Sequence, residues 1–427
     1  MTEVIGYIGM THLGLNSAAG ALARGAVVLC FDPNAALIER LRLGDFPINE
    51  PELAETFTAN KDRLSFSSSA ADLEVCDVVY VAPDVATDDS GNSDLSELLS
   101  LLEIAEVNAS DRAVLVILSQ VAPGFTRPRA KTRRHFYYQV ETLVFGLAVQ
   151  RARDPERFIV GCADPLQPLP NAYLRFLERF DCPILPMRFE SAELTKIAIN
   201  CFLVAQVSTT NTLAEICENV DADWSEIAPA LRLDARIGQK AYLKPGLGIA
   251  GGNLERDLTS IIKIGERFDA DVGVIRAEIA NSGYRKGTAA RMFRDHVLPN
   301  LGQDPTLAVW GLAYKENTHS IKNSPSLATL EAFPSQTFQV HDPVVRAEDT
   351  GLHNLQEHED PFDALTGADC LMILTPWDVY REAAPDIIAS KMRGRVVIDP
   401  YAVLDAAAAR ASGLRLMVLG KPVSEED

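Results

Sequence analysis

A lysine and an asparagine stand four residues apart in a segment with helical periodicity. Lys196 and Asn200 therefore share one face of the predicted helix. A lysine presented beside an asparagine could stabilise a developing alkoxide, or it could lose its proton and act as a base. The spacing alone favours an ordinary solvated lysine, so a chemical role for the pair depends on the segments around it.

A glycine-rich segment follows downstream and ends in a carboxylate. Residues 244–257 read KPGLGIAGGNLERD, with four glycines in seven residues. Such a segment lets a ligand approach the backbone closely. Asp257 could act on a proton, cap the helix that is predicted to start there, or do both.

A second glycine motif lies directly after the first predicted strand. Residues 9–14 carry the first and third glycines of the dinucleotide fingerprint G-x-G-x-x-G, Gly9 and Gly14, with Thr11 in the middle position. Asp32 ends the second predicted strand, where an acid binds ribose hydroxyls and repels a 2′-phosphate. A glycine-rich turn in another α/β protein is the alternative, but the acid in register favours a dinucleotide site that prefers NAD to NADP.

Charge and cysteine usage disfavour several other classes of protein. The 427 residues carry a formal net charge of −19, which opposes binding to nucleic acid or to an anionic membrane. Seven cysteines without CxxC spacing predict free thiols in a reducing cytoplasm, with neither a zinc site nor a disulfide framework. Cys30, Cys76 and Cys370 lie in or beside apolar runs and are expected to be buried. Because the sequence contains no run of eighteen apolar residues, no membrane span is expected. The N-terminal residues are typical of a strand and not of a signal peptide.

Short apolar runs alternate with helical patterns at both ends of the chain. The predicted strands lie at 4–8, 27–31, 78–81 and 114–118, and again at 307–312, 339–341, 370–374 and 396–398. Helical patterns at 13–24 and 95–106 separate strands of the first set. A helical pattern at 192–219 opens a middle region with more helix to about residue 297, and Asn, Gly, Asp and Pro at 300–305 mark its end. The order predicts an α/β chain with doubly wound parallel sheets before and after a helical centre.

Several segments together resemble the UDP-glucose/GDP-mannose dehydrogenase family over nearly the whole chain. Residues 119–124 are similar to its S-T-V-P-P-G, 138–146 to N-P-E-F-L-x-E-G, and 193–200 to E-L-x-K-x-x-x-N. Further matches lie at 49–51, 234–238, 311–325, 342–343 and 375–377. No single motif decides the matter, whereas their joint order and spacing identify the chain as a member.

The resemblance implies two Rossmann-like doubly wound domains joined by a central helical domain. Residues 1–185 would bind NAD, residues 186–300 would form a homodimer, and residues 301–427 would bind a nucleotide sugar. NAD is the implied cofactor, and a UDP-sugar is the family's commonest substrate. A cytoplasmic oxidoreductase of polysaccharide biosynthesis is the implied setting, with no metal.

The family's reaction oxidises a sugar C6 alcohol to a carboxylate with two NAD, through a cysteine-bound thiohemiacetal and a thioester. By position, Lys196 and Asn200 would stabilise oxyanions, Asp257 with a water would handle protons, and Glu141 would help hydrolyse the thioester. The implied cofactor contacts are Gly9, Thr11, Gly14, Asp32, Ser119 and Gln120. The implied substrate contacts are Tyr242, Gly248, Lys315 and Arg236, the last reaching the neighbouring subunit's sugar.

The sequence departs from the family pattern at the nucleophile. The family loop G-F-G-G-S-C-F-x-K-D places its cysteine at Asn253, and no cysteine lies between Cys217 and Cys370 to replace it. An amide cannot form a thiohemiacetal. Other departures lie on the substrate side, at Gln120, Phe145, Lys322 and Tyr401.

Three hypotheses follow from this departure. The first is a two-electron dehydrogenase that oxidises an alcohol of a nucleotide sugar to a carbonyl. The second is a four-electron oxidation through a hydrated aldehyde, with water activated by Glu141 or Asp257. The third is a non-catalytic protein that binds NAD and a nucleotide sugar. The number of NADH formed per sugar (one, two or none) separates them.

Two further features need the structure for their interpretation. His12 lies inside the phosphate loop, where a contact at the helix N-terminus is expected. The one basic run is expected to be a solvated face, with an anion site or a contact between subunits as the alternative. Its members are Arg127, Arg129, Lys131, Arg133 and Arg134.

Overall fold

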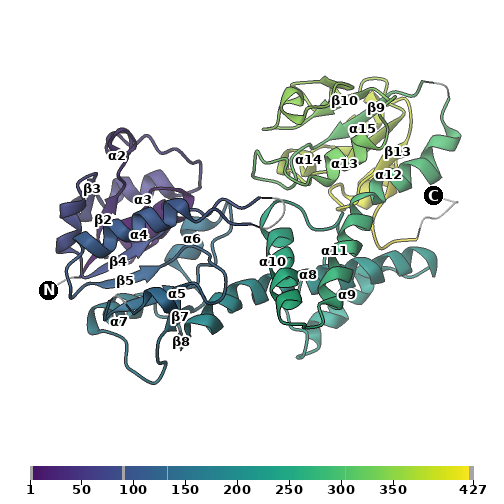
Figure 1. Ribbon diagram of the computed structural model, residues 1–427. Helices are drawn as coiled ribbons and strands as arrows, with labels where there is room; N and C mark the ends of the chain where they lie inside the picture. The colour runs from purple at the N-terminus through teal and green to yellow at the C-terminus, as the bar shows by residue number, and fades with distance from the viewer. Residues whose placement is uncertain (1–2, 89–91, 132, 303, 423–427) are drawn as a thin grey trace. The chain divides into compact units, whose positions relative to one another are not determined.

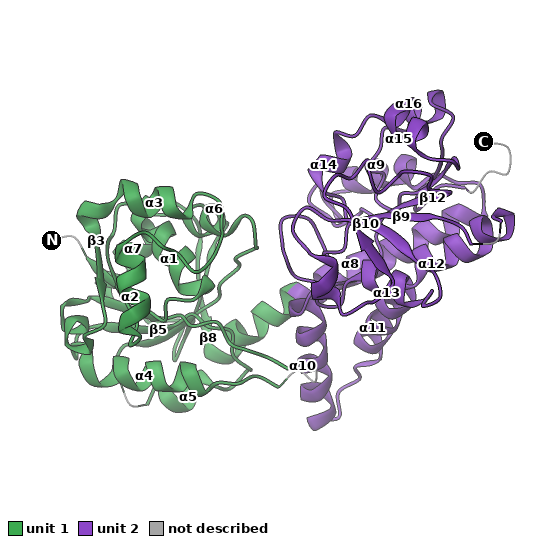
Figure 2. Cartoon of the chain, turned by 90° about the horizontal axis from the view of Figure 1, so that it is seen from above, with its two compact units in different colours: residues 1–199 green, residues 200–427 purple. Residues whose placement is uncertain are grey.

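The apolar runs of the sequence form two sheets, one in each of two units. The computed structural model describes residues 3–88, 92–131, 133–302 and 304–422. Contacts between residues divide the chain into unit 1, Met1–Ile199, and unit 2, Asn200–Asp427 (Figure 2). The fold is mixed α/β, with helices around each sheet and a helical region in the middle of the chain (Figure 1).

The sheet of unit 1 has eight strands in the order β3-β2-β1-β4-β5-β6-β7-β8. They are β1 (Val4–Ile8), β2 (Val27–Phe31), β3 (Leu64–Ser67), β4 (Val78–Val81), β5 (Val114–Ile117), β6 (Phe136–Gln139), β7 (Phe158–Cys162) and β8 (Ile184–Arg188). The first six follow the doubly wound order 3-2-1-4-5-6, and β7 runs antiparallel to β6. Strands β4 and β5 are buried throughout, as expected for parallel strands that helices cover on both faces.

Helices pack on both faces of this sheet. They are α1 (His12–Ala23), α2 (Ala35–Arg42), α3 (Leu53–Ala59), α4 (Ser96–Asn108), α5 (Thr126–Arg129), α6 (Ala148–Arg153) and α7 (Asn171–Glu178). One apolar core joins α1, α3 and α7 to the sheet, and a second core joins α4 and the start of α8 to the other face. Helices α1 and α6 pack closely because Gly20 leaves room for Ala152, whose backbone a Cβ would meet at 2.5 Å.

The long helix α8 (Phe189–Asn219) begins in unit 1 and ends in unit 2. By length and composition alone it could cross a membrane, with a mean hydropathy of 1.2 over an 18-residue window of which 28% is buried. One such helix is weak evidence for a span, and α8 also carries the charged residues Glu193 and Lys196.

Unit 2 combines the helical middle with a second sheet. Its first helices after α8 are α9 (Trp224–Leu233), α10 (Asn253–Arg267), α11 (Gly273–Lys286) and α12 (Thr288–Met292). Helices α8, α10 and α11 pack around Val204, Ile249 and Leu258. The glycine-rich segment lies directly before α10.

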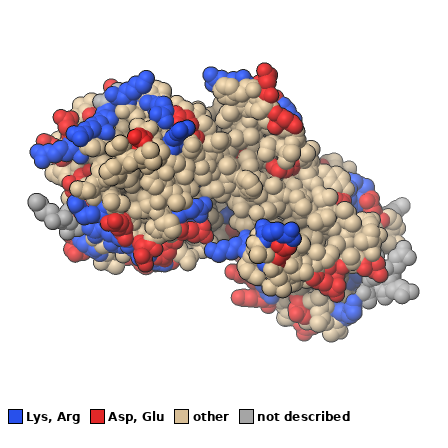
Figure 3. All heavy atoms as spheres, turned by 90° about the horizontal axis from the view of Figure 1, so that it is seen from below, with Lys and Arg blue, Asp and Glu red and all other residues tan. Residues whose placement is uncertain are grey.

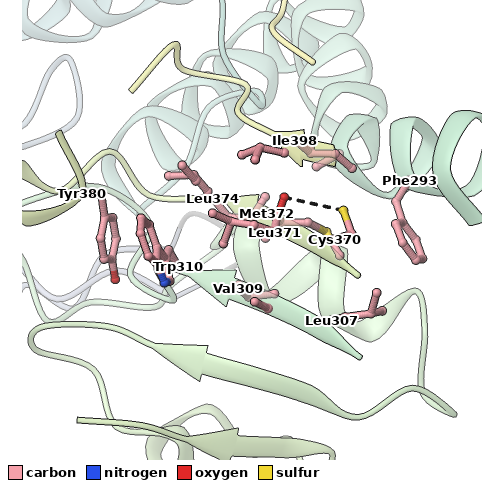
Figure 4. Close-up of a cluster of buried hydrophobic side chains, with 14 of the residues drawn as sticks. Phe293, Leu307, Val309, Trp310, Cys370, Leu371, Met372, Leu374, Tyr380 and Ile398 are labelled. Atoms are coloured by element: carbon pink, nitrogen blue, oxygen red, sulfur yellow. Dashed lines mark hydrogen bonds between the residues drawn. The ribbon is translucent and has the colours of Figure 1, made fainter. Parts of the chain in front are cut away.

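The sheet of unit 2 is parallel, with six strands in the order β11-β10-β9-β12-β13-β14. They are β9 (Leu307–Trp310), β10 (Phe338–His341), β11 (Leu355–Glu357), β12 (Cys370–Ile373), β13 (Val396–Ile398) and β14 (Arg415–Met417). The helices of this part are α13 (Pro325–Glu331), α14 (Asp378–Arg381), α15 (Pro385–Lys391) and α16 (Ala406–Ala411). In its core Trp310 stacks on Tyr380 with ring centroids 4.9 Å apart (Figure 4). The strand order is again 3-2-1-4-5-6, so the predicted pair of Rossmann-like sheets is confirmed.

Three arginines of the basic run make contacts within unit 1 while staying partly exposed. Arg127 pairs with Glu190, and Arg133 donates to the carbonyls of Glu106 and Ala109 at the end of α4. The Arg129 guanidinium lies 3.8 Å from the ring centroid of Phe125. These three arginines are partly exposed, so the expected solvated face is found only in part. Over the face drawn in Figure 3, acidic and basic side chains lie interspersed.

The seven cysteines are free thiols, and the predicted buried set is confirmed. Cys30, Cys76 and Cys370 are all buried. Among the described residues, no group of three or more His, Cys, Asp or Glu side chains is placed to hold a metal ion.

Candidate active site

The phosphate loop joins β1 to α1, and its two glycines are sterically required. Gly9 has φ +91°, and a Cβ there would lie 3.0 Å from the Pro83 nitrogen. A Cβ on Gly14 would lie 2.0 Å from the Gly9 carbonyl oxygen. Any side chain at Gly14 would push the first turn of α1 away from the loop.

Thr11 shapes this loop through its hydroxyl. The hydroxyl oxygen accepts a hydrogen bond from the Asp84 N–H at 2.9 Å and does not cap α1. The first-turn N–H groups of α1 are therefore left without a side-chain cap, which is the arrangement that binds phosphate at a helix N-terminus. The residues present fit a dinucleotide diphosphate at this turn.

Asp32 directly follows β2, beside the phosphate loop, and its carboxylate holds two backbone segments. Its Oδ2 accepts from the Met10 N–H and its Oδ1 from the Asn34 N–H, both at 2.9 Å. Each carboxylate oxygen keeps a further lone pair for a ribose hydroxyl. Burial raises the pKa of Glu97 in α4, and the negative charges of Asp32, Asp84 and Asp94 raise it further. Such a concentration of acids opposes a 2′-phosphate.

The loop after β5 is tied to α8. Buried Glu193 accepts from the N–H groups of Gly124 and Thr126 at 2.6 and 2.8 Å. Ser119 is fully buried, and its hydroxyl donates to the Pro83 carbonyl at 2.6 Å. Ser119 is thus used inside the protein, whereas Gln120 beside it is partly exposed.

Lys196 and Glu141 form an ion pair in unit 1. The Lys196 ammonium donates to Glu141 Oε1 at 2.8 Å and to the Glu141 carbonyl at 3.0 Å. The second carboxylate oxygen of Glu141 accepts from the Leu143 N–H at 2.7 Å. Both side chains are mostly buried, at 13% and 18% exposed, so solvent screens the pair less than a surface pair. A solvated surface lysine is therefore the wrong interpretation of Lys196.

Asn200 and Asp257 meet in unit 2. The Asn200 amide donates to Asp257 Oδ2 at 2.5 Å, and Arg256 Nε lies 3.1 Å from Asp257 Oδ1. Helix α10 begins at Asn253, so the buried Asp257 stands inside the helix and the prediction that it caps a helix is wrong. Arg256 was not predicted as a site residue, although a basic residue directly before the carboxylate was a visible signal.

The glycine-rich segment packs closely against side chains from α11 and from the loop after β9. Gly248 has φ +90°, and a Cβ there would meet the Ser282 carbonyl oxygen at 2.6 Å. A Cβ on Gly251 would meet the ring of Tyr314 at 3.1 Å, and one on Gly252 would meet the Lys322 side chain at 3.3 Å. Tyr314 follows β9, at the carboxyl edge where ligands bind in parallel α/β sheets.

The predicted substrate contacts are only partly brought together. The Lys315 ammonium lies 5.8 Å from the ring centroid of Tyr314, which places it beside the glycine-rich segment. Tyr242 is half exposed, and its backbone is bonded to Gln206 and Thr210 of α8. Arg236 is exposed and pairs with Asp234 in its own turn, at 2.6 Å.

Asn253 is the exposed first residue of α10. Cys201, the residue after Asn200, does not offer a reactive thiol in unit 2. Burial raises the pKa of Cys201 to about 11, and the charges of Glu278 and Asp257 contribute to the rise. A thiol with so high a pKa is a poor nucleophile at neutral pH.

Three domain models of one family match this chain in order. The NAD binding domain of the UDP-glucose/GDP-mannose dehydrogenase family matches residues 3–167, its central domain matches 190–282, and its UDP binding domain matches 308–406. The chain belongs to the UDP-glucose/GDP-mannose dehydrogenase family. It is accordingly an NAD-dependent nucleotide-sugar dehydrogenase, and NAD is its cofactor.

Individual members of the family align with this chain along nearly its whole length. The chain is 30% identical to UDP-glucose 6-dehydrogenase of Pseudomonas aeruginosa, over 97% of each chain. It is 26% identical to UDP-glucose 6-dehydrogenase TuaD of Bacillus subtilis, over 98% of this chain and 93% of the relative. Among solved structures, a UDP-glucose dehydrogenase from Pyrobaculum islandicum aligns with a TM-score of 0.79 at 26% identity, covering 96% of this chain and 98% of that one.

Proposed function

We propose that this dehydrogenase oxidises one alcohol of a UDP-sugar to a carbonyl and forms one NADH per sugar. The observation that carries the proposal is Asn253 at the first position of α10, where the family pattern has its cysteine. An amide cannot trap an aldehyde as a thiohemiacetal. The raised pKa of Cys201 argues against a substitute thiol nearby in the sequence.

The residues of the phosphate loop would hold the cofactor. The first turn of α1, with Gly9 and Gly14 beneath it, would bind the diphosphate, and Asp32 would bind the adenosine ribose. Gln120 would line the same site from the loop after β5. Bound NAD supplies the acceptor for one hydride.

The Lys196–Glu141 ion pair and the Asn200–Asp257 pair would act on the substrate alcohol. The Lys196 ammonium, held in place by Glu141, would stabilise the alkoxide that forms when the alcohol loses its proton. Asn200 would donate to the same oxygen. Asp257, held by Asn200 and Arg256, would receive the proton through a water.

The substrate would be bound by the second sheet and the glycine-rich segment. Lys315 would contact the sugar nucleotide, with Gly248 and Tyr242 lining the sugar. A division into three domains at residues 185 and 300 belongs to the same proposal. Arg236 would reach the sugar of the neighbouring subunit, which its exposure permits.

A homodimer in the cytoplasm belongs to the same proposal. Large apolar side chains lie exposed on α8, at Phe202, Leu213 and Ile216, and at Val220 directly after it. An apolar face of this kind on one helix is expected to be covered by another copy of the chain. It also accounts for the hydropathy of α8 without a membrane.

A panel of nucleotide sugars with NAD tests the proposal. NADH is measured per sugar consumed, and each product is identified by mass. A carbonyl product with one NADH from a UDP-sugar supports the proposal. A preference for a GDP-sugar would overturn the base assignment, and binding without turnover would favour the non-catalytic alternative.

A four-electron reaction is the second candidate. The retained pair of Glu141 and Lys196 favours it, because a carboxylate held in this way could activate a water toward an aldehyde. The product would then be a uronate formed through a hydrated aldehyde, with two NADH per sugar.

A further inference from the structure

The phosphate loop is linked to the segment that carries Glu141 through one side chain, His12. His12 is the first residue of α1. Its ring centroid lies 4.2 Å from that of Phe145, with the two ring planes tilted by 36°. Its Nε2 lies 3.2 Å from Glu50 Oε2. His12 and Phe145 are each unusual in the sequence, but nothing in their spacing predicts that their rings meet.

Glu50 extends this link to the next helix. Its carboxylate is buried, and its second oxygen accepts from the Ala148 N–H at 2.9 Å. Ala148 begins α6, which packs against α1 (Figure 2). His12 therefore contacts the segment 141–148 twice, directly at Phe145 and through Glu50 at Ala148.

The other end of the same segment holds the carboxylate of the Lys196 ion pair. Glu141 is fixed there by Lys196 and by the Leu143 N–H. Residues 142–147 form neither helix nor strand, and the Phe145 side chain is 49% exposed. Arg151 also donates to the Thr142 carbonyl at 2.6 Å, so the start of the segment is held firmly, whereas His12 supplies the ring contact near its end.

We propose that His12 is a positioning residue that couples the diphosphate of bound NAD to the segment carrying Glu141. A diphosphate at the first turn of α1 lies beside residue 12, because residue 12 opens that turn. The Glu50 carboxylate contacts Nε2, which leaves Nδ1 for the diphosphate. Because both partners are anionic acceptors, the imidazole that joins them carries a proton on each ring nitrogen. Ordering the imidazole orders the ring of Phe145 that packs against it, and with it the segment back to Glu141.

The coupling must also act in the opposite direction. If NAD orders the segment, an ordered segment strengthens NAD binding by the same factor. Removing the Phe145 ring should therefore weaken NAD binding although the ring is not part of the phosphate loop. An aromatic pair of this kind predicts a loss of about two- to tenfold in affinity.

The test uses the full chain with NAD alone and needs no turnover. NAD affinity is measured by calorimetry for the wild type, Phe145→Ala, His12→Ala and the double variant. Hydrogen–deuterium exchange of residues 142–148 is followed with and without NAD. Phe145→Tyr keeps a ring, and Leu147→Ala removes an exposed side chain of the same segment that has no ring contact with His12. Thermal melts confirm that each variant is folded.

We expect NAD to slow exchange at residues 142–148 in the wild type, in Phe145→Tyr and in Leu147→Ala. The slowing should be lost in Phe145→Ala and in His12→Ala, and the double variant should bind NAD no more weakly than the weaker single variant. Multiplied losses in the double variant, or unchanged slowing in Phe145→Ala, would overturn the coupling. The role of Glu141 in this inference rests on the proposed function. The binding and exchange measurements contain no sugar, so they test the coupling separately from the reaction. An NADH yield other than one per sugar would contradict the proposed function without contradicting the coupling.

Discussion

At the scale of single residues, the polar groups of the site are each held by a second group. Glu141 holds Lys196 in unit 1, and Arg256 and Asn200 hold Asp257 in unit 2. Fixed partners of this kind hold charged groups in place before the reaction. Such electrostatic preorganisation makes the largest contribution to the rate enhancement of many enzymes. The predictions at this scale therefore concern the loss or gain of one such group.

Replacing Asn253 by cysteine tests the missing nucleophile. A thiol at the first position of α10 would have its thiolate favoured by the helix N-terminus. Asn253→Cys should therefore raise the yield from one NADH per sugar toward two, with a carboxylate among the products. Asn253→Ser is the matched control, since a hydroxyl of similar size should leave one NADH per sugar. A reactive thiol at 253 without a second NADH would show that the sugar pocket has also changed.

Removing the charge of Glu141 tests the ion pair. Glu141→Gln should lower kcat by roughly a hundredfold, because Lys196 loses the carboxylate that holds it toward the alcohol. NAD affinity should change little. Glu52→Gln is the control, because it breaks an exposed ion pair with Arg153 that lies in the same unit. Equal kcat values in the two variants would contradict a role of Glu141 in the reaction.

Several site residues could be predicted from local patterns, and others could not. Gly9, Gly14 and Asp32 follow from the fingerprint, because strand, turn and helix are consecutive in the sequence. The contact of Tyr314 with Gly251 joins residues 63 positions apart in the chain. Nothing in the periodicity of either segment indicates it. The start of α10 was misplaced by four residues because Asp257 is a better N-cap residue than Gly252, and burial beside Asn200 overrides that preference.

At the scale of elements, α11 (Gly273–Lys286) carries a buried carboxyl group to which no described residue donates a hydrogen bond. Glu278 is 6% exposed, and its Oε2 has no hydrogen bond among the described residues. Burial alone raises the pKa of Glu278. A group whose pKa is raised on folding stabilises the protein below its unfolded pKa and loses that stabilisation as the pH rises through its folded pKa.

Glu278→Gln should therefore stabilise the protein at pH 8. The gain in the free energy of unfolding should be about 1 kcal/mol or more, because a neutral amide replaces a buried charge, and it should shrink as the pH falls toward 4.5. Urea titrations at several pH values measure it. Glu266→Gln, at an exposed position of α10, is the control and should show little change. A gain that grows toward acid pH would contradict the assignment of Glu278 as a destabilising charge.

The strands that could be predicted are those inside the sheets. Strands β1, β2, β4 and β13 have the predicted bounds, and β5 ends one residue earlier than predicted. These strands are nearly continuous apolar runs, since helices cover both of their faces. Strand β8 was missed because it lies at the sheet edge, is largely exposed and contains Pro186.

At the scale of the whole molecule, the exposed face of α8 predicts the oligomeric state. Phe202→Glu combined with Ile216→Glu should convert a dimer to monomers of 46.6 kDa, because two charges would be buried without partners at the interface. Light scattering during size exclusion measures the mass. Leu43→Glu, on the exposed surface of unit 1, should leave the dimer intact. A monomeric wild type at micromolar concentration would contradict the proposal.

The central claim is that a family member with an amide at position 253 removes a single hydride from its substrate. The most direct test is the amount of NADH formed per mole of UDP-sugar, measured to completion with NAD in excess and with the product identified by mass. The account predicts one NADH and a product lighter than the sugar by two hydrogens. Two NADH together with a carboxylate product would contradict it.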